Sequence, residues 1–298
     1  MNEDAIAPVV AAMLILAVVV TFFAAWNAYY VPAMKAQSEI THSKEVESGF
    51  LRFSSDIETA ASLKKNMRLS ETIPLGGGEF AFDTVKSGGL LRVQGESEEY
   101  LLLRITNEEQ TEITRFRLSN FTYRPVNNFW QDQGYIWSYG IVNVTKDTLT
   151  TPLQYANMDA VTYGMTGSLF DLDSAPTPEN PATCSVMNVY LVTITPAARH
   201  TLASGNGNGM LTLESMVTNQ QFSNTTSMSV RINPEIPDRF RDTFWESVNQ
   251  RINESLSCTN VHVFPNPDPS NPEVFFAFDT IPNMTVNRKT TEISLGAY

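Results

Sequence analysis

The chain begins with one long apolar segment and then changes to a different pattern. No charged residue or histidine occurs between Ala5 and Val31, and aliphatic residues and phenylalanine dominate the segment. A helix needs roughly 20 apolar residues to cross a bilayer. The segment 5–31 is therefore predicted to be a helix that suits a membrane. Trp26 and Tyr29 lie at its end, where interfacial aromatic residues are found.

Three interpretations of this segment differ in what happens to it. A helix in a soluble core seldom stays uncharged over such a length. A cleaved secretory signal has a basic start and a shorter apolar stretch. This chain instead starts "MNEDAIA" and has no lysine or arginine before Lys35. The sequence thus favours a helix that is retained in the mature protein.

A second helical pattern follows Pro32. Val46, Phe50, Phe53 and Ile57 are spaced by four, three and four residues, which places them on one helix face. We expect an amphipathic helix over 33–65, continuous with the first segment apart from a kink or short melted stretch at Pro32. Its apolar face either packs on its own domain or contributes to a spine shared with neighbouring subunits.

From residue 66 onward the pattern becomes that of short strands. Runs such as "EEYLLLRITN", "SVMNVYLVTITP" and "EVFFAFDT" are rich in β-branched and aromatic residues, and glycine, proline and asparagine separate them. The pattern predicts an α+β chain. A long N-terminal helix (1–65) precedes an antiparallel β-sandwich or jelly-roll-like domain (66–298). One helix over 236–254, with Phe240, Phe244 and Val248 on one face, covers the sheets. We expect 171–184 to be a proline-rich loop.

Composition and charge narrow the function. The chain has 298 residues, of which 42% are hydrophobic and 17% charged, so it can form a sizeable core. Its net charge of −12 repels phosphate groups, which argues against a nucleic-acid partner. The two cysteines, Cys184 and Cys258, can form one disulfide in an extracellular setting or remain free thiols.

Candidate chemistry is sparse. His42, His200 and His262 lack the spacing of a metal site, and Asp171 and Asp173 form a DxD sequence without an EF-hand pattern. The glycine-rich stretches "LGGGEF" and "SGNGNG" are interpreted as turns, since neither has the context of a phosphate loop. No nucleophile motif is present. We expect neither an enzyme nor a cofactor.

Five N-x-S/T sequons follow the apolar segment. Their number is close to what chance gives in a chain rich in asparagine, serine and threonine. If the β part lies outside the cell, they are candidate N-glycosylation sites. They begin at Asn120, Asn143, Asn224, Asn253 and Asn283.

The start of the chain resembles the N-terminal segment of archaeal type IV pilins. "DAIAPVVAAMLILAVVVTFFAAW" has an acidic or small start, a Pro-Val step and an aliphatic run. Asp4, Pro8, Val9 and Val10 match that pattern. The resemblance covers about the first 30 residues, and beyond them only the general architecture is similar. Pilin precursors carry a short basic leader, so we expect either that Met1 begins a mature chain or that processing differs.

The resemblance implies a filament whose core is a bundle of N-terminal helices, with the β domains outside. Before assembly the helix would be stored in the membrane, and its partners in the filament would be copies of the same chain. In such a core Glu3 or Asp4 would pair with a neighbour's α-amino group, and Ala11, Ala17 and Ala24 would allow close helix approach. The expected core residues are Pro8, Val9, Val10, Leu14, Leu16, Val18, Phe22 and Phe23. The alternative is a monomeric membrane-anchored surface protein for adhesion or ligand binding.

Overall fold

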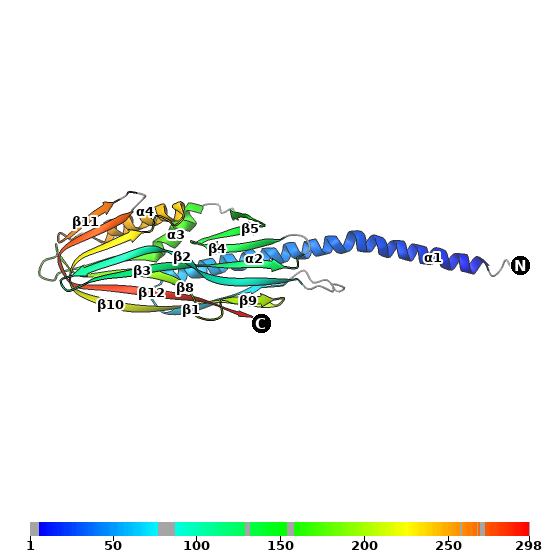
Figure 1. Ribbon diagram of the computed structural model, residues 1–298, viewed down its shortest axis with the longest axis horizontal. Coiled ribbons are helices and arrows are strands. Elements are labelled where there is room, and N and C mark those ends of the chain that lie inside the picture. Colours follow the sequence, from blue (N-terminus) through cyan, green and yellow to red (C-terminus); the bar gives the residue numbers. More distant parts are fainter. Residues whose placement is uncertain are drawn as a thin grey trace.

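The computed structural model describes residues 6–76, 87–128, 132–153, 158–256, 258–266, 268 and 272–297. A long helix projects from one end of an elongated β domain (Figure 1). The predicted α+β organisation, with a long N-terminal helix before a β-rich domain, is confirmed. Glu3, Asp4 and most of the "LGGGEF" stretch lie outside the described residues.

The helical rod consists of three consecutive elements. They are α1 (Ile6–Ala25), the π-helical segment η2 (Trp26–Tyr30) and α2 (Val31–Ser62). The expected break at Pro32 is not seen, because the helix continues through it. The wider π turn lies directly before the proline, and the Val31 N–H donates to the Trp26 carbonyl. A π-bulge thus takes the place of the expected melted stretch.

Twelve strands form one hydrogen-bonded sheet. Its main order is β6-β5-β4-β3-β2-β10-β12-β8-β7, with β1 beside β10, β11 beside β12 and β9 beside β2. Among the strands of the described residues, β12 pairs in parallel with β8 and the other pairings are antiparallel. The strands are β1 (Met67–Pro74), β2 (Gly88–Asn107), β3 (Thr111–Val126), β4 (Gln133–Ser138), β5 (Ile141–Lys146), β6 (Leu149–Pro152), β7 (Phe170–Pro176), β8 (Cys184–Pro196), β9 (Leu202–Gly205), β10 (Asn208–Ile232), β11 (Val261–Asn266) and β12 (Glu273–Ala297).

Two shorter helices lie beside the sheet. The predicted covering helix is α4 (Asp238–Ser255), which buries Phe240, Phe244 and Val248. A second helix, α3 (Met158–Leu169), was not expected. The first half of the predicted loop 171–184 is also different, because β7 extends through it and pairs with β8.

The second half of α2 forms part of the core of the β domain. Val46, Phe50 and Phe53 have no exposed surface, and Ile57 has 1%. The Phe50 ring lies 4.9 Å from that of Phe121. Gly49 lets β1 approach the helix closely, since a Cβ there would collide with the Ile73 side chain. The apolar face of α2 therefore packs on its own domain, which is the first of the two interpretations of this face.

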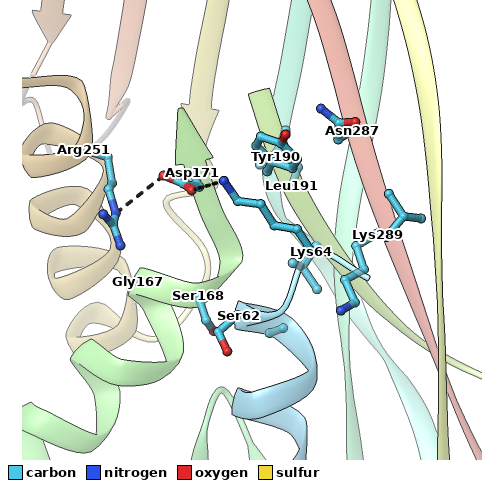
Figure 2. A pocket seen from close by; sticks show the side chains of 13 residues that line it. Ser62, Lys64, Gly167, Ser168, Asp171, Tyr190, Leu191, Arg251, Asn287 and Lys289 are labelled. Carbon is cyan, nitrogen blue, oxygen red and sulfur yellow. Dashed lines mark ion pairs between the residues drawn. The ribbon is translucent and has the colours of Figure 1, made fainter. Parts of the chain in front are cut away.

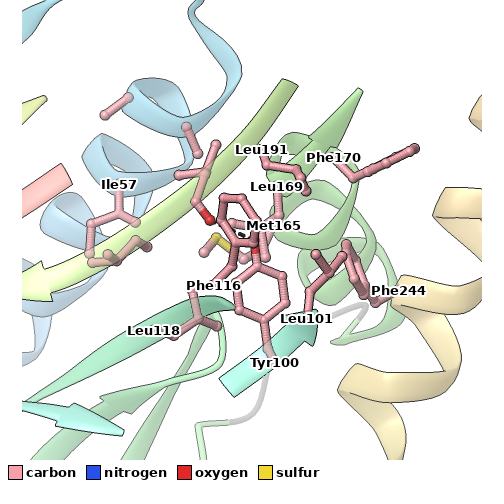
Figure 3. Close-up of a cluster of buried hydrophobic side chains, with 14 of the residues drawn as sticks. Ile57, Tyr100, Leu101, Phe116, Leu118, Met165, Leu169, Phe170, Leu191 and Phe244 are labelled. Carbon is pink, nitrogen blue, oxygen red and sulfur yellow. Dashed lines mark hydrogen bonds between the residues drawn. The ribbon is translucent and has the colours of Figure 1, made fainter. Parts of the chain in front are cut away.

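The core continues beyond the helix toward α3 and α4 (Figure 3). The Tyr100 ring lies 5.4 Å from Phe244, and its hydroxyl donates to the Val192 carbonyl. On the other side, Trp137 stacks on Phe121 and donates from Nε1 to the Ser54 hydroxyl of α2. Buried aromatic side chains therefore join the long helix, the sheet and α4 into one unit.

Buried tyrosines make the domain sensitive to alkali. Burial raises the pKa of Tyr100 and of Tyr123 above the ordinary tyrosine value of about 10, and raises that of Tyr139 to about 12. Above about pH 10 the unfolded chain loses protons that the folded domain keeps, so stability falls. At about pH 12 the loss is on the order of a few kcal/mol for each fully buried tyrosine.

Denaturant unfolding measured from about pH 10.5 to 12 tests this expectation. Tyr100→Phe is expected to reduce the decline of the unfolding free energy with pH, even though it also removes one hydrogen bond. An unfolding free energy that stays constant over this range would contradict the assignment.

Candidate functional site: the projecting apolar helix

The outer part of the helix exposes apolar side chains that soluble proteins normally bury. Val18 is 66% exposed, Phe22 65% and Leu14 63%. The helix is long and apolar enough to cross a membrane, and none of its apolar window is buried. All the residues predicted for a filament core are exposed on it, namely Pro8, Val9, Val10, Leu14, Leu16, Val18, Phe22 and Phe23.

The few polar side chains of this part are satisfied within the helix. The Thr21 hydroxyl donates to the Ala17 carbonyl at 2.9 Å, and the Asn27 amide donates to the Phe23 carbonyl at 3.1 Å. A polar group that returns its hydrogen bond to its own backbone costs less in an apolar medium. The helix can therefore present all its faces to lipid or to other apolar helices.

An aromatic ladder marks the end of the apolar part. The rings of Phe22 and Trp26 are stacked at 6.4 Å, and those of Trp26 and Tyr30 at 4.9 Å. Tyr29 is 77% exposed beside them. The first charged residue after the ladder is Lys35. This order of apolar, aromatic and charged residues is typical of a helix that leaves a membrane interface.

The helix enters the β domain through a set of polar contacts. Nε2 of His42 lies 3.1 Å from the Pro74 carbonyl, and burial lowers the pKa of this imidazole, partly offset by that hydrogen bond. The Tyr135 hydroxyl contacts Ser43 at 2.8 Å. Further along, Arg52 forms an ion pair with Glu71 of β1. The apolar part is thus held at one end of the domain by contacts on several faces of α2.

The C-terminal end of α2 has a partner that the sequence did not indicate. Lys289 of β12 is 5% exposed, and its amino group donates to the carbonyls of Leu63 and Lys65. These acceptors lie just beyond the last turn of α2, where helix carbonyls lack partners within the helix. Burial, with a smaller effect of Lys65, lowers the pKa of Lys289 to about 8. A lysine in a β-strand pattern is normally assigned to the surface, so the pattern gave no signal.

The structure separates the five sequons by accessibility. Asn224, Asn253 and Asn283 are exposed, whereas Asn120 and Asn143 are partly buried. The Asn120 amide also donates to Glu96 at 3.1 Å. The first three therefore present their side chains to solvent, and Asn120 does not.

The cysteines and the candidate metal ligands have structural surroundings. Cys184 and Cys258 are joined as a disulfide with their Cα atoms 5.5 Å apart. Asp171 forms ion pairs with Lys64 and Arg251, in β7 and not in a loop. Over the described ranges, no group of three or more histidine, cysteine, aspartate or glutamate side chains is placed to hold a metal.

Comparison with known proteins adds no identification. No family model, curated protein or solved structure matches the chain. Functional inference therefore depends on the projecting helix and the domain that holds it.

Proposed function

We propose that the protein is a structural subunit of an extracellular type IV pilus-like filament. Its apolar segment 5–31 would form the filament core with copies of itself, and the β domain would face outward for surface contacts or adhesion. The observation that carries the proposal is the exposure of a charge-free helix on a domain that is itself well packed. Such a surface requires an apolar partner.

The helix is suited both to a membrane and, later, to the core of a filament. The ten valine, isoleucine, leucine and phenylalanine residues between Pro8 and Trp26 favour lipid by roughly 3 to 6 kcal/mol on the insertion scale. Small residues at Ala17, Thr21 and Ala24 leave room for close packing with other helices. The same segment can therefore be stored in lipid before assembly and packed against identical helices afterwards.

A membrane-anchored surface protein that acts as a monomer is the second candidate. The aromatic ladder at Phe22, Trp26 and Tyr30 favours it, because this arrangement suits a permanent position at a membrane interface. The two candidates differ in what touches the helix: copies of the chain or lipid.

Photo-crosslinking from within the helix distinguishes them. We expect Phe22→benzoylphenylalanine, illuminated in native cell-surface material, to join subunits through peptides of the apolar helix. The matched control places the same residue at Phe264, which is 57% exposed on β11. It should give no adducts that include the helix. If Phe22 yields adducts with lipid alone in all fractions, the filament proposal is wrong and the anchored protein is favoured.

A further inference from the structure

A pocket opens where the end of α2 meets α3, α4 and the sheet (Figure 2). Its volume is about 90 Å³. A buried water needs roughly 10–15 Å³ on this scale, so the pocket has room for several waters or one small solute. The residues that line it come from segments far apart in the sequence, so no sequence motif indicates the pocket.

The charged side chains around this pocket are mostly basic. Lys64, Arg251 and Lys289 line it together with one carboxylate, Asp171, so three positive charges less one negative charge leave +2. Lys64 lies 2.7 Å and Arg251 3.8 Å from Asp171, which they approach from opposite sides (Figure 2). In a chain of net charge −12, this local excess of positive charge is unusual.

Part of this charge has a structural use. Lys289 donates to the carbonyls of Leu63 and Lys65, just beyond the end of α2, and Arg251 also lies 3.6 Å from Glu254. Asp171 is therefore the only carboxylate that lines the pocket within the described part of the chain. Asp171 and Glu254 together balance two of the three cations at the pocket. One positive charge, that of Lys289, is left at the pocket without a carboxylate partner within the described part of the chain.

A neutral hydrogen-bond donor, the amide of Asn287, also lines the pocket. Asn287 is 7% exposed, and its side chain has no hydrogen-bond partner among the described residues. The cation of Lys64 lies 3.9 Å from the centre of the Tyr190 ring, which fixes one wall. The amide of Asn287 is not sealed from solvent, so water in the pocket can hydrogen-bond to it. Its position on the pocket wall makes this amide available to a polar solute.

We propose that this pocket binds a small oxyanion, in the form of a phosphate or carboxylate group carried by a small solute. Lys64 and Arg251 supply charge-assisted hydrogen bonds, and Asn287 supplies a neutral donor. Both cations are nearly half exposed, at 46% and 43%, so a solute can reach them from outside. Asp171 competes with the ligand for the same two cations. The site belongs to the β domain and does not depend on filament assembly.

Calorimetric titration of the full chain in detergent tests the site, with inorganic phosphate and acetate as separate probes at constant ionic strength. Saturable binding is expected for at least one probe, and the comparison shows whether phosphate or carboxylate is preferred. Arg251→Gln is expected to weaken binding about tenfold or more, because it removes a charge-assisted donor. Asp171→Asn is expected to strengthen it, because it removes the competing carboxylate.

Arg239→Gln is the matched control. Arg239 lies on the same helix, is 51% exposed and does not line the pocket. Its replacement is expected to leave the affinity unchanged. No saturable binding of either probe to the unmodified chain would overturn the proposal. So would equal losses in Arg239→Gln and Arg251→Gln, since these would indicate unspecific attraction to surface charge.

Discussion

Val18→Asp is expected to abolish filament assembly while the β domain remains folded. Val18 lies in the middle of the charge-free segment and is 66% exposed, far from the core of the domain. An aspartate at the centre of an apolar helix costs about 2.5–3.5 kcal/mol on the insertion scale, whereas valine contributes favourably. In a filament every subunit would carry this cost. The yield of sheared filaments, measured beside the thermal unfolding of the purified chain, reports the two effects separately.

Two control substitutions make the result specific to helix packing. Val18→Leu keeps the position apolar, and we expect it to assemble. Ala24→Leu makes the helix more apolar, so it should still enter a membrane, but its larger side chain would hinder close approach of neighbouring helices. We therefore expect Ala24→Leu to reduce assembly with normal membrane insertion. If the Val18→Asp variant formed filaments in normal yield, the proposed helical core would be wrong.

Phe50→Ala is expected to cost about 3–5 kcal/mol of unfolding free energy, as removal of a buried aromatic ring generally does. The Phe50 side chain has no exposed surface, and its ring lies 4.9 Å from Phe121 and 5.8 Å from Tyr135. These contacts fix α2 to the sheet, so the loss should also loosen the base of the projecting helix. Denaturant unfolding followed by tryptophan fluorescence suits the measurement, because Trp137 stacks on Phe121.

The same substitution in the outer helix is the control. Phe22 is 65% exposed in α1, and Phe22→Ala is expected to change the unfolding free energy of the domain by less than about 0.5 kcal/mol. If Phe50→Ala were as mild as Phe22→Ala, the inner face of α2 would not be part of the core. The amphipathic stretch would then be available to neighbouring subunits.

The long helix was predictable because its signals are local. The absence of charge over 5–31 and the spacing of Val46, Phe50 and Phe53 define two different helix faces without reference to the rest of the chain. The effect of Pro32 on the helix was harder to predict. A π turn before Pro32 lets the helix continue, and no simple sequence pattern distinguishes that outcome from a break.

The helix α3 was missed because its inner face is partly polar. Thr162 and Thr166 are buried there, and Gly164 and Gly167 weaken the helical pattern. The lengths of β10 and β12 were also not evident. Both continue through polar stretches, which pair with each other and so remain extended. Sheet order and the parallel pairing of β12 with β8 depend on contacts between distant segments, which an alternation pattern does not contain.

The pocket illustrates the limit of sequence reasoning most clearly. Lys64, Asp171, Arg251 and Asn287 come from four separate elements or connections, and each alone resembles an ordinary surface or strand residue. The DxD sequence lacks an EF-hand pattern, and in the fold the neighbours of Asp171 are cations. Only the arrangement of the chain in space gives these side chains a common chemistry.

Electron microscopy of material sheared from the native cell surface, with peptide mass spectrometry of the same fraction, tests the central claim most directly. We predict filaments that contain this chain, with the apolar helices in the core and the β domains outside. Recovery of the chain solely in detergent-solubilised membrane, with none in sheared filaments, would contradict the account and favour a membrane-anchored surface protein.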